Sequence, residues 1–502
     1  MTHPLDIPEI AHQVGSYLNR KTLFACVLVS HPWHQSFLPL LWSDCSGNRT
    51  AAHGRPFFSE VEKNRHFIRH LSTSYLETDV ALKCYRIDFP RLVRLTVGIR
   101  PLSLGPITYT SSRKKSSSLP IINNFIRRHQ KTLQSLCIYV EPPGHLEWSK
   151  EKPFLELRSI WSLVLSTQAA QGSVNLGQQR LRSLTLRGIE INWDELEACS
   201  GLWDILRELD TLTLTNWSVA KTWMPIRVDS FFEPLAHSKI RHLDIQNGDD
   251  LSRYENNLIS QCCSLQSLTL HSKFNSHTEH LFTNMAEGNP WPYLEDIEIH
   301  HSGLSDQEYT TLVERIGRPL RRLTISGSGF QLLSAIALLE SGGGRHRASL
   351  EVLRLTNAIM LQGAWTQRVL CLLPRLKIFH CCSIIENKDI KADPRDWACN
   401  QLQNFRVTPR LTTLRVTSSP NAHPAQMSDP AANYSLMFKR LAGLTHLHTL
   451  QVGVMCCDKL KVPHATTLAS HFENDGIMLK WTEEPKGLDW EDRCDWECGD
   501  LQ

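Results

Sequence analysis

The sequence predicts an α/β protein in which a short module of three helices precedes an irregular solenoid of strand and helix repeats. Two observations lead to this class. Helix signals crowd the first 42 residues, and one short apolar template then recurs along most of the remaining chain. A chain of 502 residues is long enough for several domains, but repeat proteins lengthen without dividing into separate cores. We therefore expect the helical module at 1–45, the solenoid at 60–480 and a separate tail at 481–502.

The first helix is predicted to begin beside Pro8. Asp6 and Glu9 have the spacing of a capping box, and a proline is tolerated in the first turn because its missing N–H would have no helical partner there. Apolar residues then recur at helical spacing over 7–18, and Asn19 is expected to end the helix.

Two further helices are predicted from the apolar segments at 23–29 and 33–42, the second of which is rich in large side chains. A segment of about 40 residues can bury little area within itself. So many large apolar side chains therefore predict contact with a partner or with the domain that follows.

The residues of this module resemble the F-box family. The family pattern of Leu-Pro-x-Glu-Ile, a Cys/Val-rich second helix, Val-Ser-x-x-Trp and a terminal Leu-Trp is matched by Ile7-Pro8-Glu9-Ile10, Cys26, Val29-Ser30, Trp33 and Leu41-Trp42. The resemblance covers under a tenth of the chain. At its start the usual Leu-Pro is stretched to Leu5-Asp6-Ile7-Pro8, a form that looks like fungal F-box proteins.

The resemblance implies that the module binds the Skp-type adaptor of a cullin-RING ubiquitin ligase of the SCF type. The residues that it implies in adaptor binding are Leu5, Pro8, Glu9, Ile10, Val14, Leu18, Leu23, Val29, Trp33, Leu41 and Trp42. The alternative is that these helices only cap the core of the following domain and bind no adaptor.

The template that recurs is Leu-x-x-Leu-x-Leu, which predicts a strand with alternate residues buried. Clear copies begin at Ile160, Leu181, Leu209, Ile240, Leu265, Leu294, Leu320 and Leu350. Looser copies begin at Ile68, Leu92, Leu133, Leu373, Leu402 or Leu411, and Leu447. The clear copies are 21 to 31 residues apart, about 27 on average, which is the period of leucine-rich repeats. Stacked units would pair their strands in a parallel sheet on the concave face, with helices on the convex face.

The unit from Leu294 can be followed to its end. A helix is expected to start at Ser305 and to stop at Gly317, before the next strand. This unit resembles the cysteine-containing class of leucine-rich repeats that accompanies many F-boxes, although the usual Asn or Cys of that class is not consistent here. Polar or glycine-rich stretches near 101–118, 341–349 and 417–433 predict flexible loop insertions.

Residues that point outward from the strands are the expected contact surface for a protein substrate, because the core does not use them. They are Thr211, Thr213, Thr215, His242, Asp244, Gln246, Asp296, Glu298, His300, Arg322, Thr324 and Arg354. The strongest candidates for substrate binding are Thr213, His242, Asp244, Gln246, Asp296, Glu298, His300, Arg322 and Arg354. The alternative is a generic hydrophilic face, with binding in a loop or at one end.

Composition argues against several classes of partner. Lys and Arg number 54 against 51 Asp and Glu, so a net charge of +3 gives no general basic field for nucleic acid. The basic run Arg127-Arg128-His129 is typical of a solvated helix end. No stretch approaches a membrane span or a secretory signal, so we expect a cytoplasmic or nuclear protein with reduced cysteines. The acidic tail carries Trp481, Trp490 and Trp496, which we expect to cover the last strand.

No motif for catalysis is found. Gly-x-Ser-x-Gly, a phosphate loop and His-Glu-x-x-His are all missing, so we expect no catalytic residue, no cofactor and no metal site. His300-His301 is among the nearest candidates for metal ligands, and surface histidines are the expected interpretation. The sequence therefore favours a non-catalytic substrate-recognition subunit of a ubiquitin ligase, with an adaptor-independent interaction scaffold as the alternative.

Overall fold

The computed structural model describes residues 7–45, 54–73, 78–99, 119–140, 155–156, 181–191, 205–215, 218–219, 238–246, 258–271, 282, 291–300, 304–326, 329–358, 372–383, 413–418, 449–453 and 478–482. The chain divides into two compact units, 1–264 and 265–502, which we describe in turn. Among the described residues, no helix combines the length and the apolar character needed to cross a bilayer.

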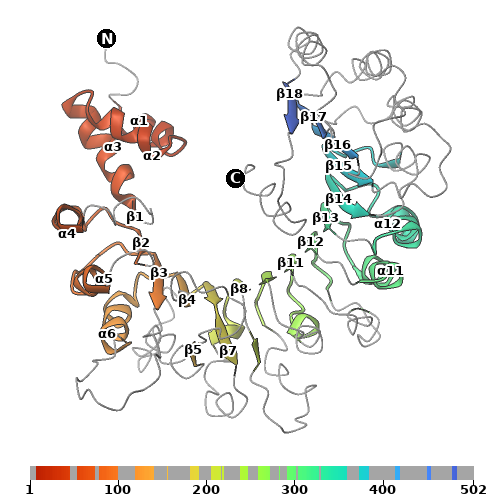
Figure 1. Ribbon diagram of the computed structural model, residues 1–502, viewed down its shortest axis with the longest axis horizontal. Helices are drawn as coiled ribbons and strands as arrows, with labels where there is room; N and C mark the ends of the chain where they lie inside the picture. The colour runs from red at the N-terminus through yellow and green to blue at the C-terminus, as the bar shows by residue number, and fades with distance from the viewer. Residues whose placement is uncertain are drawn as a thin grey trace, which may run out of the picture. The chain divides into compact units, whose positions relative to one another are not determined.

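The first unit begins with three short helices (Figure 1). They are α1 (Pro8–Gly15), α2 (Arg20–Val27) and α3 (His31–Ser43). Their core is formed by Ala11, Leu23, Val27 and Phe37, all at most 7% exposed. The three helices predicted from the sequence are thus present.

The caps of these helices differ in part from the prediction. Ile7 is the N-cap of α1 and makes no side-chain capping bond, so the expected Asp6–Glu9 capping box does not begin this helix. Asn19 does not end the first helix but begins the second, because its side-chain oxygen accepts a hydrogen bond of 2.9 Å from the Thr22 N–H. Ser30 caps α3 in the same way, at 3.4 Å from the Trp33 nitrogen.

Parallel strands follow in the first unit. In spatial order they are β1 (Asp44–Cys45), β2 (His70–Ser72), β3 (Arg94–Ile99), β4 (Ser135–Val140), β6 (Ser183–Arg187), β8 (Thr211–Thr215) and β10 (His242–Gln246). The helices α4 (Gly54–Lys63), α5 (Thr78–Cys84) and α6 (Leu119–His129) lie along one side of β2, β3 and β4 (Figure 1). A small second parallel sheet, which the sequence did not predict, is made by β5 (Leu155–Glu156), β7 (Ile189–Ile191) and β9 (Ser218–Val219).

The second unit also has a parallel sheet in which each strand pairs with the next. Its strands are β11 (Ser267–His271), β12 (Asp296–His300), β13 (Arg322–Ser326), β14 (Val352–Ala358), β15 (Ile378–Ser383), β16 (Thr413–Ser418), β17 (Thr449–Gly453) and β18 (Met478–Thr482). Helices α11 (Asp306–Arg315) and α12 (Leu332–Gly344) connect β12 to β13 and β13 to β14. This arrangement of parallel strands and helices is α/β and solenoid-like.

The register of the strands explains the repeating template. Its second and third apolar positions pair with the same positions of the next strand, as Ile297 does with Leu323 and Ile299 with Ile325. These side chains are at most 2% exposed, whereas the residues between them are partly exposed. Each unit therefore contributes two buried apolar residues, which pack beside their counterparts on the next strand. No single unit could bury these side chains alone.

Most of the predicted copies coincide with strands. The clear copies from Leu181 to Leu350 precede β6, β8, β10, β11, β12, β13 and β14. Of the looser copies, Leu411 rather than Leu402 precedes β16, and Leu447 precedes β17. The copy at Leu373 is shifted by three residues, because Phe379 rather than Leu376 pairs with Leu353. The copy at Ile160 lies outside the described residues.

Two boundaries also differ from the expected ones. Helix α12 continues to Gly344, whose φ of 77° ends it, so the connection expected at 341–349 is reduced to a short turn. His346 in that turn is completely buried. Strand β18 continues the sheet to Thr482, past the expected end at 480. The insertion at 101–118, most of 417–433, and the tail with Trp490 and Trp496 lie outside the described residues.

Candidate functional site

Helix α1 has small residues on its inner face and large apolar residues on its outer face. Ala11 and Gly15 are buried against α3, and a Cβ on Gly15 would lie only 2.3 Å from Leu40 Cδ1. On the outer face, Ile10 and Val14 are both 38% exposed, and Tyr17, just beyond the end of the helix, is 84% exposed. This is the reverse of an ordinary amphipathic helix, whose large apolar residues face its own core.

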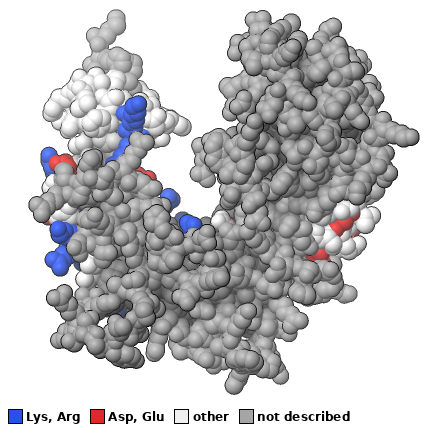
Figure 2. Space-filling model, in the orientation of Figure 1, with Lys and Arg blue, Asp and Glu red and all other residues white. Residues whose placement is uncertain are grey.

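Helix α2 extends the same kind of surface. Leu23 and Val27 point into the core of the module, whereas Phe24 and Leu28, one residue further along, are 57% and 70% exposed. We call the exposed large apolar residues of the module its apolar surface. They are Ile7, Ile10, Val14, Tyr17, Phe24, Leu28 and Val29. In Figure 2 the described surface of these helices is mostly free of charged side chains.

The residues predicted to bind an adaptor fall into two groups. Those that are exposed are Pro8, Glu9, Ile10, Val14 and Val29. Those that are buried in the core of the module or packed against it are Leu18, Leu23, Trp33 and Leu41. Trp42 is half-buried, and Leu5 lies outside the described residues. Sequence reasoning missed Tyr17, Phe24 and Leu28, although Tyr17 continues the helical spacing of Ile10 and Val14.

Trp33 illustrates the difference between the two groups. Its ring meets that of Phe37 edge-on, with centroids 5.5 Å apart, and Phe37 is completely buried. A substitution at Trp33 would therefore change the folding of the module as well as its surface.

All but one of the polar strand positions predicted in the first unit are at least partly exposed, as the template places them. Thr213, Asp244 and Gln246 are half-buried and His242 is exposed. The Gln246 amide donates a hydrogen bond of 2.9 Å to Asp244 Oδ2. Thr215, which was expected to point outward, is instead buried at 9% exposure.

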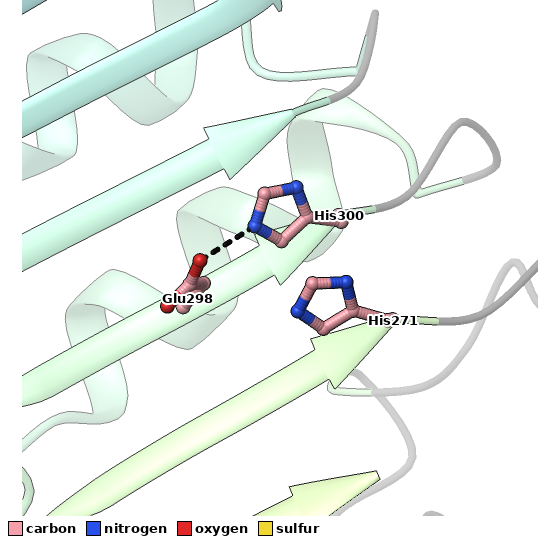
Figure 3. Close-up of side chains that lie close together, drawn as sticks. All are labelled: His271, Glu298 and His300. Atoms are coloured by element: carbon pink, nitrogen blue, oxygen red, sulfur yellow. Dashed lines mark hydrogen bonds and ion pairs between the residues drawn. The ribbon is translucent and has the colours of Figure 1, made fainter. Parts of the chain in front are cut away.

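In the second unit the same positions bring charged side chains together. Glu298 Oε1 lies 2.7 Å from His300 Nε2, and the His271 ring stacks on that of His300 (Figure 3). The hydrogen bond with His300 is the main reason why the pKa of Glu298 is below its usual value, and His271 and Arg354 act in the same direction. Sequence reasoning missed His271, although it occupies the strand position that corresponds to His300.

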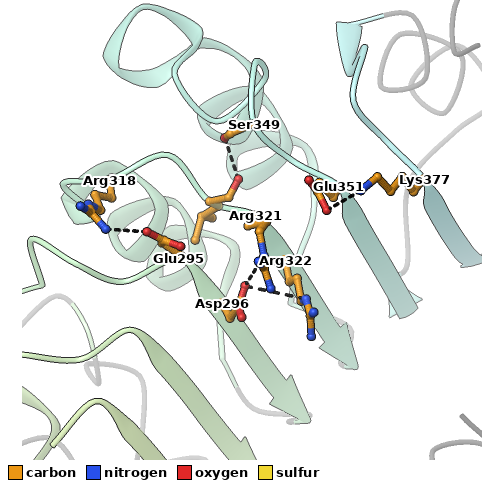
Figure 4. A network of polar contacts seen from close by, with 9 residues as sticks. Glu295, Asp296, Arg318, Arg321, Arg322, Ser349, Glu351 and Lys377 are labelled. Atoms are coloured by element: carbon orange, nitrogen blue, oxygen red, sulfur yellow. Dashed lines mark hydrogen bonds and ion pairs between the residues drawn. The ribbon is translucent and has the colours of Figure 1, made fainter. Parts of the chain in front are cut away.

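Asp296 lies at the beginning of the same face. Its Oδ1 is 3.6 Å from Arg321 Nε and 4.0 Å from Arg322 Nε (Figure 4). The acidic residues of β12 are therefore partly neutralised by basic residues of β13 and β14, since Arg322 pairs with Asp296 and Arg354 acts on Glu298.

Ion pairs also connect consecutive repeats at the entrances of the strands. Arg318 Nη1 lies 2.5 Å from Glu295 Oε1, and Lys377 Nζ lies 3.0 Å from Glu351 Oε2 (Figure 4). In the first unit Lys239 and Glu208 form a similar pair at 2.8 Å. Exposed pairs of this kind contribute about 0–1 kcal/mol each, so we assign them to the alignment of repeats rather than to a binding site.

The basic run at the end of α6 has a structural role. Arg128 donates hydrogen bonds to the carbonyl oxygens of Tyr85 and Arg86. His129 was expected to be solvated, but it is only 3% exposed, and its ring centroid lies 4.6 Å from that of Phe125. Burial lowers the pKa of His129 to about 4.

Six cysteines whose side chains are described have free thiols: Cys26, Cys45, Cys84, Cys137, Cys262 and Cys263. Burial raises the pKa of Cys45, Cys84 and Cys262 to about 12, so these three are protonated and unreactive at neutral pH.

Comparison with known proteins adds no family. No protein-family model matches the chain, and no curated protein sequence matches it. The functional argument therefore depends on the two surfaces described above: the apolar surface of the helical module and the polar face of the strands.

Proposed function

We propose that this chain is the substrate-recognition subunit of a cullin-RING ubiquitin ligase of the SCF type. In this proposal the N-terminal helices are an F-box that binds a Skp-type adaptor, and the leucine-rich-repeat strands bind a protein substrate. The single observation that carries the proposal is the reversed helix α1, which buries Ala11 and Gly15 and exposes Ile10 and Val14.

Energetics favour a partner on this surface. Exposed apolar groups are stabilised by removal from water, at about 25 cal/mol per Å² of buried area. Protein interfaces have such apolar centres, and single exposed apolar residues do not need an explanation, whereas a concentration of them does. Seven large apolar residues are exposed on α1, on α2 and at the ends of these two short helices. The resemblance of Pro8, Glu9 and Ile10 to the F-box pattern is the reason why we propose a Skp-type adaptor as this partner.

The chain would contribute geometry rather than chemistry to ubiquitin transfer. A receptor that holds a substrate beside the ubiquitin-carrying enzyme raises the effective concentration of the reacting groups. The parallel sheet of the second unit is suited to this task because its strands present half-buried polar residues in a fixed register.

The alternative is an adaptor-independent interaction scaffold in which the helices only cap the repeats. A cap would use its large apolar residues to cover the neighbouring core. In this chain Phe24 and Leu28 are instead more than half exposed. This observation favours the receptor over the scaffold.

The test is co-expression of the full chain with a Skp-type adaptor, followed by size-exclusion chromatography. The variant Ile10→Asp with Leu28→Asp places two charges on the apolar surface without altering the buried core. Each buried charge should cost several kcal/mol, enough to abolish co-elution of a nanomolar complex. The matched control is Gln13→Asp, which adds a charge at an exposed polar position of the same helix.

The receptor proposal is supported if the parent chain and Gln13→Asp co-elute with the adaptor and the double variant elutes alone with unchanged melting. It is wrong if the parent chain never meets the adaptor under conditions in which both are folded. The scaffold would then be the better description.

A further inference from the structure

A cluster of three potential metal ligands lies on the polar strand face of the second unit. His271 ends β11 and His300 ends β12, and the two residues are direct partners in the parallel register. Glu298 lies two residues before His300 on β12, so its side chain points to the same face. In Figure 3 the three side chains stand together in front of the strands.

The distances within the cluster are short. The two imidazole rings are stacked, with centroids 4.1 Å apart and planes inclined by 16°. Glu298 Oε1 is 2.7 Å from His300 Nε2. One ligand atom from each of the three residues lies within 4.8 Å of the others. Small rotations of the side chains would bring these atoms to the separations found around a single ion, whose bonds to nitrogen are about 2.0–2.1 Å long.

The environment is also suitable. The His300 side chain is only 14% exposed and that of Glu298 is 38% exposed, so the cluster is partly shielded but accessible from solvent.

We propose that His271, Glu298 and His300 form a binding site for a divalent transition metal, with Zn²⁺ as the ion. Two imidazoles and one carboxylate are an established Zn²⁺ ligand set. Three protein ligands leave at least one coordination position for water or for a side chain of a bound protein. This inference departs from the sequence expectation of no metal site, and it does not depend on the proposed receptor function.

The site arises from the fold rather than from a sequence motif. His271 and His300 belong to consecutive repeats and meet only because the strands pair in this register. A motif search finds ligands that are close in sequence, such as His300-His301, and misses ligands from adjacent strands.

The experiment is calorimetric titration of the full chain, first stripped with a chelator, with Zn²⁺. The variants His271→Ala, His300→Ala and Glu298→Gln alter one ligand each. The control is His242→Ala, which removes an exposed histidine from a strand of the first unit. Other sites, including those made by some of the 15 cysteines of the chain, contribute equally to all variants, so the difference between titrations reports on this cluster.

The parent and His242→Ala should bind one equivalent more than His271→Ala and His300→Ala. Glu298→Gln should weaken that equivalent by at least about tenfold. The Glu298→Gln substitution keeps the size of the side chain and is therefore expected to leave the fold intact. For each variant that is compared, the melting temperature in the absence of metal must equal that of the parent. When Co²⁺ replaces Zn²⁺ as a probe, the parent should show a d–d absorption band that is lost in the histidine variants.

Equal stoichiometry and affinity in the parent and in Glu298→Gln would overturn the proposal. So would a thiolate-to-cobalt band that disappears in the histidine variants, since this would assign the ion to cysteines.

Discussion

The carboxylate of Asp306 caps the helix that contains Ser334 in the next repeat. Asp306 Oδ1 lies 3.0 Å from the backbone nitrogen of Ser334 and 2.9 Å from that of Gln331. Its other oxygen lies 2.9 Å from the nitrogen of Leu333. The first residue of α11 therefore accepts hydrogen bonds from backbone N–H groups at the start of α12, and one side chain connects two consecutive helices.

We expect Asp306→Ala to lower the free energy of unfolding of the second unit by about 2 kcal/mol. The loss of a cap costs about 1 kcal/mol, and the loss of a negative charge at a helix N-terminus adds about 0.3–1 kcal/mol. Chemical denaturation gives the value. Glu314→Ala is the control, because it removes a carboxylate from the exposed last turn of the same helix, and it should be neutral. Equal effects of the two substitutions would refute the capping role.

His346 should make the stability of the second unit depend on pH. Its Nδ1 accepts a hydrogen bond of 3.1 Å from the Leu320 N–H, and its Nε2 lies 3.3 Å from the Val313 carbonyl oxygen. The ring is completely buried, and burial, together with Arg345, lowers its pKa from 6.5 to about 4. The neutral ring is thus the form that the fold holds.

The sign of the effect follows from proton linkage. Between pH 4 and 6.5 the unfolded chain binds a proton at this residue and the folded chain does not. The neutral, buried His346 therefore contributes about 3 kcal/mol to the free energy of unfolding above pH 6.5, and this contribution is lost as the pH falls toward 4. Unfolding measured across this range should show a smaller slope for His346→Gln than for the parent. His242→Gln, at an exposed position, should keep the parental slope; identical slopes for all three chains would contradict the prediction.

Gly329 allows a close approach of two backbone segments. A Cβ at this position would lie 1.5 Å from the carbonyl oxygen of Leu304, and a backbone atom cannot move aside as a side chain can. Gly329→Ala should therefore cost about 3 kcal/mol or more. Gly344→Ala provides the comparison, since its φ of 77° is unfavourable but its nearest contact is 3.5 Å, and it should cost about 1–2 kcal/mol. A reversal of this order in urea denaturation would show that the approach to Leu304 can relax.

The strands could be predicted from the sequence, but the contacts between repeats could not. Alternate burial leaves a visible pattern, so the copies at Leu294 and Leu320 marked β12 and β13. The contact of His271 with His300 depends on the register of strands in different repeats, and the loop lengths between them do not encode it directly. His346 shows the same limit, because its glycine-rich surroundings predicted a flexible connection, whereas the Leu320 N–H holds the ring in the core.

The helical module should depend on Phe37 for its fold. Phe37 is completely buried among Ala11, Leu23 and Val27. Replacement of a buried phenylalanine by alanine costs about 3–5 kcal/mol, and a core this small has little stability to lose. In Phe37→Ala we expect α1 to α3 to unfold while the second unit remains folded. Hydrogen exchange should therefore increase strongly in these helices and remain unchanged in β11 to β14.

Gln35→Ala is the control for this variant, because Gln35 is exposed on the same helix. The comparison also separates two ways of losing a partner. Phe37→Ala should lose adaptor binding because the module unfolds, whereas Ile10→Asp with Leu28→Asp should lose it with native hydrogen exchange in α1 to α3. Native exchange in Phe37→Ala would mean that contacts outside the core of the module hold its helices in place.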